Sequence, residues 1–304
     1  MSGADLTVAI CTFRRPDGLR ATLRGLGACA RLDGVSIEVL VIDNDPDGSA
    51  AWAEREGPEL CGFPLRYVHE PAAGLTHARN RAIEESPGVR ALVFLDDDEI
   101  PRPGWLAAFW GAHLAHPDDV HIGPVISVLS VPLPAWADER WPFGRPEHPD
   151  GAVIPNAGDG NALLPRSVLA DPGLRYDHTF AFTGGQDTDL FRRVQRAGHR
   201  LRWAAHATVD ETIPDKRTEL AFTLHRTERG ATSYAYLVRS DGPFAVANRL
   251  LAVVRDGLVG AGLVLLGAFR RDASLSARGR NELVRARGTI NGLRGHLKST
   301  PTSA

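Results

Sequence analysis

Four short, continuously apolar runs alternate with amphipathic stretches over the first hundred residues, and this alternation constrains the fold more than any other feature of the chain. Runs without polar alternation are typical of strands buried on both faces, as in a mostly parallel sheet covered by helices. The pattern therefore predicts an α/β fold. The expected strands are Leu6–Cys11, Ile37–Ile42, Leu65–His69 and Ala91–Leu95, and the expected helices between them are 19–29, 49–56 and 76–85.

The next hundred residues keep this pattern but interrupt it with a long irregular segment. Pro103 is expected to begin a helix with an apolar stripe, because proline is tolerated in a first turn. Residues 132–160 are rich in Pro, Trp and Gly and are expected to form a long loop, which in compact domains is commonly functional. A strand over Asn161–Leu164, a helix over Asp187–Arg196 and a strand over Arg200–Ala204 are expected to follow.

From Thr218 onward the periodicity is helical, which separates a C-terminal part from the α/β part. A chain of 304 residues has room for two compact units at most, or for one large domain with an appendage. Helices are expected over 218–238, 244–269 and 273–297. We therefore expect an α/β unit over 1–230, built of halves 1–100 and 101–230, and a helical extension over 231–304.

The extension is basic although the whole chain is nearly neutral. Residues 239–304 carry 11 Lys or Arg and 4 Asp or Glu, whereas residues 1–238 carry 24 and 33. The expected helix over 244–269 is apolar, but its longest uncharged run, Gly257–Phe269, is 13 residues, short of the roughly 20 that a membrane span needs. Residues 240–304 therefore favour either peripheral contact with an anionic membrane, or packing on the α/β unit or in a homodimer. We expect no nucleic-acid partner.

The three cysteines, Cys11, Cys29 and Cys61, fit neither a zinc ligand set nor a disulfide framework, because their number is odd and their spacing irregular. They are interpreted as reduced thiols. No charged-then-apolar signal peptide opens the chain, and no Asn-x-Ser/Thr acceptor occurs. We therefore expect a cytoplasmic protein, with peripheral contact at the inner face of the cell membrane as one option.

Acidic residues follow three of the expected strands where each strand ends. Asp43-Asn44-Asp45, His69-Glu70 and Asp96-Asp97-Asp98-Glu99 all stand at carboxyl ends, which line the ligand crevice of an open parallel sheet. On an extended chain, Asp96 and Asp98 should leave the same face while Asp97 points away. Four consecutive acids repel one another unless a cation compensates them. Two carboxylates suffice for Mg²⁺ or Mn²⁺, which complete their shells with water and phosphate.

The usual phosphate-binding motifs are missing. The chain has no Gly-x-x-x-x-Gly-Lys-Ser/Thr loop, no Gly-x-Gly-x-x-Gly after a strand and no His-Glu-x-x-His helix. Phosphate charge would have to be met by the cation together with arginines near the strand ends, for which Arg14, Arg79 and Arg81 are candidates.

Seven strings follow one another in a fixed order over about residues 5–230. They are "VAICTFRRP", "VLVIDNDPDGSA", "EPAAGLTHARNRAIE", "VFLDDDEIPRPGWL", "GNALLPRSVL", "GGQDTDLFRRVQRAGHRLRW" and "ATVDETIPDKR". In this order they resemble the family 2 glycosyltransferases, most closely bacterial members that build cell-surface or secondary-metabolite glycans. The resemblance implies a GT-A fold, a Rossmann-like and mostly parallel sheet, a nucleotide-diphosphate sugar donor (most often a UDP-sugar), Mn²⁺ or Mg²⁺, and inversion at the anomeric carbon.

The resemblance also implies roles for individual residues. Asp96 and Asp98 match the two acids of the Asp-x-Asp motif, the first near the ribose and the second on the metal. Asp187 matches the catalytic base. The residues that match donor-binding positions are Thr12 and Arg14 in the nucleotide pocket, Asp43 at the base, Arg79 near the nucleotide, Asn161 beside the donor sugar, and Gly185 with Gln186 before the catalytic base.

Gln186 is a departure, because the family generally has Glu there. Gln can hydrogen-bond an acceptor hydroxyl but cannot take its proton, so Asp187 is the only titratable member of the pair. Asp187 also suits a helix N-cap, and the two roles are compatible. Asp189 and Glu211 are weaker candidates for the base. His206 is a candidate further metal ligand, although a lone His near a strand is more often structural.

The leading hypothesis is thus a metal-dependent inverting transferase acting on a hydroxyl of a glycan, a lipid-linked glycan or a small metabolite. Trp136, Trp141 and Phe143 in the long loop could stack on an acceptor sugar or simply hold the loop in place. Two alternatives remain. A nucleotidyltransferase or phosphohydrolase would use the same acids without Asp187, and a non-catalytic sugar-binding scaffold would lack Asp98 or Asp187, both of which are present.

Overall fold

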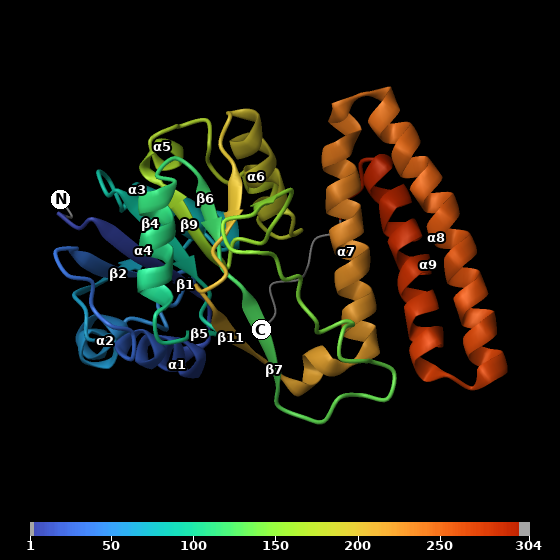
Figure 1. Cartoon of the computed structure of the whole chain (residues 1–304), viewed down its shortest axis with the longest axis horizontal. Helices are drawn as coiled ribbons and strands as arrows, with labels where there is room; N and C mark the ends of the chain where they lie inside the picture. Colours follow the sequence, from blue (N-terminus) through green and yellow to red (C-terminus); the bar gives the residue numbers. More distant parts are fainter. Residues whose placement is uncertain (1–2, 298–304) are drawn as a thin grey trace.

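The computed structural model describes residues 3–297 and confirms the α/β class (Figure 1). Its central sheet has eight strands in the order β3-β2-β1-β4-β9-β6-β10-β8, and strands β1 to β4 are mutually parallel. β9 runs antiparallel between β4 and β6. The strands are β1 Leu6–Thr12, β2 Ile37–Asp43, β3 Leu65–His69, β4 Ala91–Leu95, β6 Val120–Ile122, β8 Val153–Ile154, β9 Asn161–Pro165 and β10 Leu201–Trp203.

Helices cover both faces of this sheet, which explains why the central strand β4 is apolar throughout, whereas the edge strand β3 carries the partly exposed Arg66 and the exposed His69. Along β1, Val8 and Ile10 pack on one side while Ala9 packs on the other. The first side is covered by α1 Pro16–Gly27, α2 Ala53–Cys61 and α4 Trp105–Ala115, and the second by α3 Leu75–Glu84, α5 Arg166–Leu169 and α6 Gln186–Arg196. Cys29 and Cys61 lie in the first core, and all three cysteines are free thiols.

The helix expected over 49–56 was misplaced, since α2 begins only at Ala53. The residues before it form turns, and the buried carboxylate of Asp43 accepts a hydrogen bond from the Ala50 amide at 2.6 Å. Such a local side-chain bond competes with helix formation, which explains the later start.

A small second sheet continues the fold toward the C-terminal helices. It has the strand order β5-β11-β7, with β5 Glu99–Pro101, β11 Val209–Ile213 and β7 Val125–Leu129. Between β7 and β9 the chain forms the expected long loop, which contains only the two-residue strand β8 as a named element.

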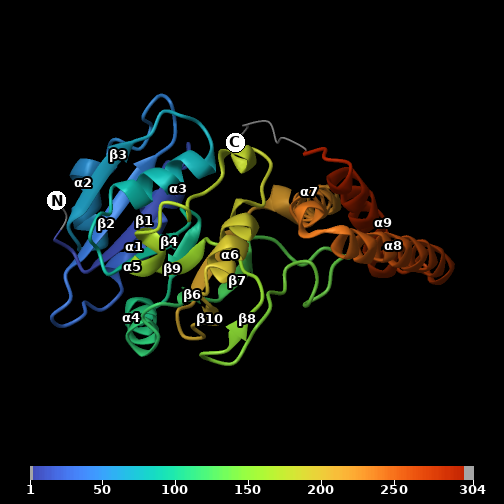
Figure 2. The ribbon, with the colours of Figure 1, turned by 90° about the horizontal axis from the view of Figure 1, so that it is seen from above.

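The C-terminal part is a three-helix unit beside the α/β part (Figures 1 and 2). α9 Ala273–Leu293 lies between α7 Leu220–Val238 and α8 Pro243–Arg270. Glycines allow the close approach: an added Cβ at Gly288 would lie 2.4 Å from the Glu228 carbonyl, and one at Gly260 would lie 2.9 Å from the Gly279 carbonyl. The remaining short helices are the 3₁₀ turns η1 His178–Phe180, η2 Asp215–Thr218 and η3 Arg239–Asp241.

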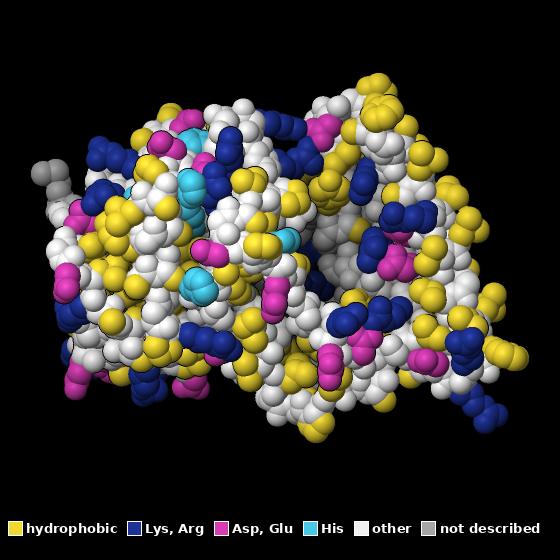
Figure 3. Space-filling model, viewed as in Figure 1, with side chains coloured by type: hydrophobic (Ala, Val, Ile, Leu, Met, Phe, Trp, Pro, Cys, Tyr) yellow, Lys and Arg dark blue, Asp and Glu magenta, His cyan; other side chains and the backbone are white. Residues whose placement is uncertain are grey.

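α8 is the outermost helix and leaves a long apolar face exposed. By length and composition alone it could cross a membrane, with a mean hydropathy of 1.9, and 17% of its most apolar stretch is buried. Its side chains form a yellow edge on the right of Figure 3. Phe244 and Phe269, near its two ends, are 79% and 87% exposed. The expectation that this helix could pack on the α/β unit is wrong, because it packs mainly on α9.

Candidate functional site

The carboxyl ends of the parallel strands open into a cavity of about 470 Å³. Thr12 from the end of β1 and the residues that follow β4 form one wall. Gly184 and Gln186, at the start of α6, and Arg229, from α7, line it from the other half of the chain. Segments more than 100 residues apart thus meet at the edge where the crevice of a parallel sheet is expected.

Asp96, Asp97 and Asp98 all line this cavity, so the expectation that Asp97 points away is wrong. Alternation holds only along a strand, and β4 ends at Leu95, after which the chain turns. The Asp97 carboxylate accepts hydrogen bonds from Thr12 Oγ1 at 2.7 Å and from the Arg15 guanidinium at 3.1 Å.

Arginines compensate the acidic cluster from three directions. Arg15 Nη1 lies 2.7 Å from Asp98 Oδ2, and Arg217 Nη1 lies 3.3 Å from the same oxygen. Arg79 is almost fully buried and donates to Asp96 Oδ1 at 2.8 Å. The repulsion expected for four consecutive acids is therefore met in part by the protein's own cations.

Arg79 also connects the acids to a carboxylate that the sequence did not single out. Its Nη1 lies 3.1 Å from Asp159 Oδ2 and donates to the Asp159 carbonyl at 2.9 Å. Burial raises the pKa of Asp159, whose side chain is 5% exposed, to about 6, with Arg79 opposing the shift. Burial likewise raises the pKa of Asp97 to about 6.

Asp187 approaches the cavity through the loop that precedes β9. A Cβ added to Gly158 would lie 3.7 Å from Asp187 Oδ2, and one added to Gly160 would lie 2.6 Å from Asp96 Oδ2. The backbone of residues 158–160 therefore runs between the two carboxylates. Burial raises the pKa of Asp187, while hydrogen bonds from Thr188 and the charge of Arg79 lower it.

Gly185, whose φ is +96°, precedes α6 and turns the chain into the helix. An added Cβ would meet Ser233 of α7 at 2.7 Å, so the start of α6 rests directly on α7. Gln186 then lines the cavity and Asp187 follows in the first turn, half-buried. Asp189, a weaker candidate for the base, pairs with Arg193 at 2.6 Å within α6.

Several residues with implied donor-binding roles make other contacts in this structure. Arg14, at φ +54°, pairs with Asp45 and Asp47, whereas its neighbour Arg15 lines the cavity. Asp43 is fully buried and accepts hydrogen bonds from the Asp45 and Ala50 amides and from the Tyr67 hydroxyl. Contact of Arg14 or Asp43 with a nucleotide stays a prediction.

Asn161 and His206 do not line the cavity, although Asn161 pairs with Leu95, the residue before Asp96. The Asn161 side chain is buried, accepts from Trp105 Nε1 and donates to the Pro124 and Ala207 carbonyls, so it ties three segments together. His206 is exposed. Their predicted roles, beside the donor sugar and on the metal, would require contacts beyond those seen here.

Four residues at the site escaped the sequence reasoning: Arg15, Asp159, Arg217 and Arg229. Asp159 stands two residues before Asn161, which was singled out, and Arg15 is next to Arg14. Sequence proximity was thus the available signal for these two. Arg217 reaches the cavity from η2 and is the last residue of the seventh string that resembles the family, although the string gave it no role. Arg229 reaches the cavity from the middle of α7, where no local pattern marks it.

The geometry of Asp96 and Asp98 shows whether the two carboxylates fit a cation. Over residues 3–297, no group of three or more His, Cys, Asp or Glu side chains is arranged to hold a metal ion. Mg²⁺ and Mn²⁺ sites with substrate phosphates need only one or two carboxylates. Asp96 keeps 41% of its side chain exposed and Asp98 21%, and both arginine contacts of Asp98 are to Oδ2. The pair fits a cation that shares its shell with a diphosphate.

Comparison with known proteins gives one family. The chain matches the model of "Glycosyl transferase family 2" over residues 7–171. It is 31% identical over 271 residues to the succinoglycan biosynthesis protein ExoM of Rhizobium meliloti, which covers 86% of this chain and 84% of that protein. It is 29% identical over 238 residues to the pre-mycofactocin glycosyltransferase of Mycobacterium tuberculosis, covering 72% of this chain but 44% of that protein.

Solved structures show the same fold. S. aureus TarS 1–349 in complex with UDP-GlcNAc superposes with a TM-score of 0.57 at 11% identity, covering 96% of this chain and 92% of that one. The mannosyltransferase PcManGT from Pyrobaculum calidifontis, in complex with GDP-Man and Mn²⁺, gives 0.57 at 19% identity, covering 95% and 88%. At such identities the likeness establishes the fold alone.

Proposed function

Because the chain belongs to glycosyltransferase family 2, we propose that it transfers a sugar from a nucleotide-diphosphate donor to an acceptor hydroxyl, with inversion at the anomeric carbon. The observation that carries the proposal is the cavity in which Asp96 and Asp98 face Gln186, the residue before Asp187. We propose a UDP-sugar as donor. Solved relatives of the same fold hold UDP-GlcNAc or GDP-Man, so the nucleotide base is the first thing to test.

Asp98 and Asp96 would hold Mn²⁺ or Mg²⁺. When bound, the cation neutralises charge on the departing diphosphate. Arg15 and Arg217, which now contact Asp98, are placed to orient the diphosphate as well. Thr12 borders the cavity at the end of β1 and fixes Asp97.

Asp187 would act as the general base. The acceptor oxygen forms a bond to the anomeric carbon, the bond from that carbon to the diphosphate oxygen breaks, and the acceptor proton passes to the carboxylate. A base of this kind contributes roughly 10²- to 10⁴-fold, and more when its pKa lies near the working pH. Burial raises the pKa of Asp187 above its usual value and so brings it closer to the working pH. Gln186 would hydrogen-bond the acceptor or donor sugar without competing for the proton.

The experiment that tests the proposal compares Asp187→Asn with Asp189→Asn. Both are first-turn acids of α6, but Asp189 is paired with Arg193 inside the helix. Asp187→Asn should lose turnover while retaining binding of UDP with Mn²⁺, and Asp189→Asn should retain both. A melting-temperature panel of UDP-, dTDP- and GDP-sugars, with and without Mn²⁺, identifies the donor beforehand. If Asp187→Asn keeps full turnover, Asp187 is not the general base.

Bacterial polysaccharide assembly is the role that the comparison with ExoM supports, because that likeness spans most of both chains. We propose a glycan or lipid-linked glycan acceptor in the cytoplasm. The catalytic unit is proposed to end after α7, because this helix runs through residue 230 and contributes Arg229 to the cavity. The boundary predicted at 230 therefore cuts a helix that both parts share.

We further propose that α8 contacts an anionic membrane surface. The helix is 28 residues long, or roughly 40 Å, and its outward face stays apolar along that length. Arg270, exposed at the C-terminal end of the same helix, supplies charge complementary to anionic lipid. Asp256 is buried and pairs with Arg255, which suits a helix that lies on the surface more than one that crosses the bilayer.

A further inference from the structure

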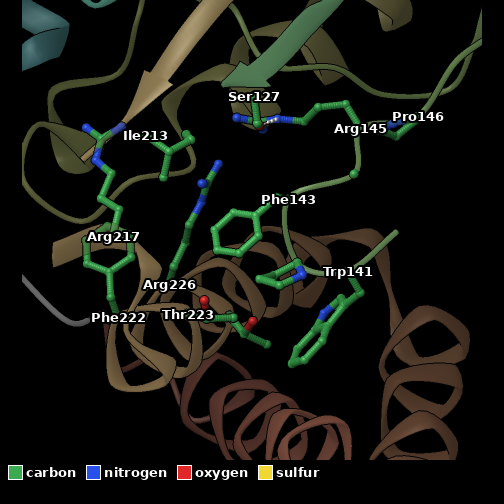
Figure 4. Close-up of a pocket in the computed structure, with 13 residues that line it drawn as sticks. Ser127, Trp141, Phe143, Arg145, Pro146, Ile213, Arg217, Phe222, Thr223 and Arg226 are labelled. Atoms are coloured by element: carbon green, nitrogen blue, oxygen red, sulfur yellow. Dashed lines mark hydrogen bonds between the residues drawn. The ribbon is translucent and has the colours of Figure 1, made fainter. Parts of the chain in front are cut away.

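A second cavity, of about 370 Å³, lies between the long loop, the small sheet and α7 (Figure 4). It shares Arg217 with the cavity at the strand ends, which is called the donor cavity from here on. The loop segment 141–146 forms one wall, and Ser127 in the middle of β7 with Ile213 at the end of β11 forms another. Helix α7 forms the third wall, through residues 222–227. The family resemblance assigned no role to a residue of this cavity, although Trp141 and Phe143 were singled out from the sequence as possible acceptor contacts. Glu211, which lines the other cavity, pairs with Arg145 and Arg217.

We propose that this second cavity binds the acceptor, and that its arginines select an acceptor sugar that carries a phosphate or carboxylate group. The inference rests on the transferase function proposed above and goes beyond it by naming the chemical class of the acceptor.

The first argument is an excess of positive charge. Arg145 and Arg217 share one carboxylate, Glu211, and Arg217 lies 2.9 Å from Glu211 Oε1. Arg226 makes no ion pair or side-chain hydrogen bond within the described part of the chain, although it lines the same cavity. Burial, followed by the charges of Arg145 and other arginines, lowers the pKa of Arg226. Arg217 also contacts Asp98 of the first cavity, so three guanidinium groups share two carboxylates and Arg226 has neither. This excess of positive charge favours an anion from outside.

The second argument is the aromatic lining. Trp141, Phe143 and Phe222 contribute to the cavity wall. Figure 4 shows the Arg226 side chain rising from α7, with Phe143 on one side and Ile213 and Arg217 on the other. Aromatic faces next to fixed cations suit a sugar ring bearing an anionic substituent, because the ring's apolar face stacks while the anion meets the guanidinium.

The third argument is the connection to the reacting centre. Arg217 lines both cavities and contacts Asp98 in the donor cavity. Along α7, Arg226 faces the second cavity, Arg229 one turn later faces the first, and Ser233 a further turn on meets Gly185. An acceptor held at Arg226 is therefore on the helix face that leads to Gln186 and Asp187.

The loop that forms the aromatic wall is held from the C-terminal helices. Arg278 of α9 pairs with Asp138 and lies over the Trp141 ring, 5.5 Å from its centroid. Trp136 packs against Trp141 edge to face, at 5.7 Å. The wall is thus fixed by packing on both sides, as a binding surface for a rigid sugar requires.

The test measures binding of glucose 1-phosphate, glucuronate, inorganic phosphate and glucose to the full chain by calorimetry, with UDP and Mn²⁺ saturating so that the donor cavity is filled. The anionic sugars should bind about tenfold or more tightly than glucose, since charge-assisted hydrogen bonds are the strong ones. Inorganic phosphate should bind more weakly than glucose 1-phosphate, because it cannot stack on the aromatic wall.

Arg226→Gln should reduce the preference for anionic sugars over glucose to less than about twofold, and Arg226→Lys should restore part of that preference. The control Arg24→Ala, which replaces an exposed arginine of α1, should leave the preference intact. Removing Arg226 relieves repulsion, so the melting temperature without ligand should not fall. Equal binding of charged and neutral sugars, or an unchanged preference in Arg226→Gln, would overturn the inference. Failure of UDP and Mn²⁺ to bind the wild-type chain would instead reject the donor proposal, so the two failures are distinguishable.

Discussion

Arg79, buried beneath the donor cavity, donates to Asp96 at 2.8 Å and lies 3.1 Å from Asp159, so one guanidinium fixes two carboxylates from different halves of the chain. A cation–π contact strengthens this placement, because the Arg79 guanidinium lies 4.9 Å from the centroid of the Phe94 ring. Asp96 therefore has its orientation set by a residue of α3 before any ligand arrives.

Arg79→Met should lower the free energy of unfolding by about 3–5 kcal/mol, because breaking a buried pair leaves carboxylates uncompensated. Denaturant unfolding at pH 7 measures this. At pH 5, below the pKa of about 6 of the buried Asp159, the loss should shrink, since a protonated acid needs no counterion. Arg81→Met on the same helix, which removes a half-exposed pair with Glu85, should cost about 1 kcal/mol or less. An equal cost for both variants would contradict this account.

Gly160→Ala should weaken UDP–Mn²⁺ binding by about tenfold or more, because the new Cβ would lie 2.6 Å from Asp96 Oδ2 and would displace a carboxylate held by Arg79. Gly158→Ala is the matched control two residues away, since its Cβ would meet Asp187 Oδ2 at an ordinary 3.7 Å. Calorimetric titration of both variants with UDP and Mn²⁺ separates them. The prediction fails if both variants bind as the wild type does.

The sequence predicts the site residues only as far as the regular alternation of side chains along each strand extends. Burial on both faces identifies the strands, and the meeting of parallel carboxyl ends identifies the edge where ligands bind. Asp97 was misplaced because alternation ends with β4 at Leu95. Arg14 was chosen over Arg15 because nothing in the sequence shows that Arg14 takes a positive φ, which accompanies its pairing with Asp45 and Asp47.

Residues that reach the site from other elements were predictable only by resemblance or not at all. Gln186, Asp187 and Arg217 stand in strings that resemble the family, but the strings gave Arg217 no role. Arg229 enters only because α7 packs against the start of α6. Such placement depends on tertiary contacts between segments more than 100 residues apart, and a local pattern carries no record of it.

Gln186→Glu should move the acid limb of the pH profile of kcat to higher pH. Asp187 must be ionised to accept a proton, and burial already raises its pKa above the usual value, so turnover falls as the pH drops through that raised pKa. A second carboxylate beside it raises the pKa further, by about one unit, because like charges disfavour ionisation. Initial rates between pH 5 and 8 measure the shift. An acid limb that stays in place would show that Asp187 is not the group being titrated.

A triple substitution of Leu251, Leu258 and Leu265 by Ser should abolish binding of the chain to vesicles of anionic lipid. These leucines recur every seven residues on the outward face of α8 and are 68–72% exposed, so their loss removes apolar area from the contact without opening a core. The melting temperature should therefore stay within a few degrees of the wild type.

Point substitutions test the membrane proposal better than removal of α8 and α9 does. α9 supports α7 through the Arg287–Glu228 pair at 2.6 Å, and α7 lines both cavities. The matched control replaces Leu114, Leu133 and Val153, which are 40–55% exposed outside α8, and should bind vesicles normally. Cosedimentation with anionic and with neutral vesicles gives the readout, and light scattering gives the mass in solution. If the α8 variant halves a dimeric mass while vesicle binding persists, this face joins two copies of the chain and the membrane proposal is wrong.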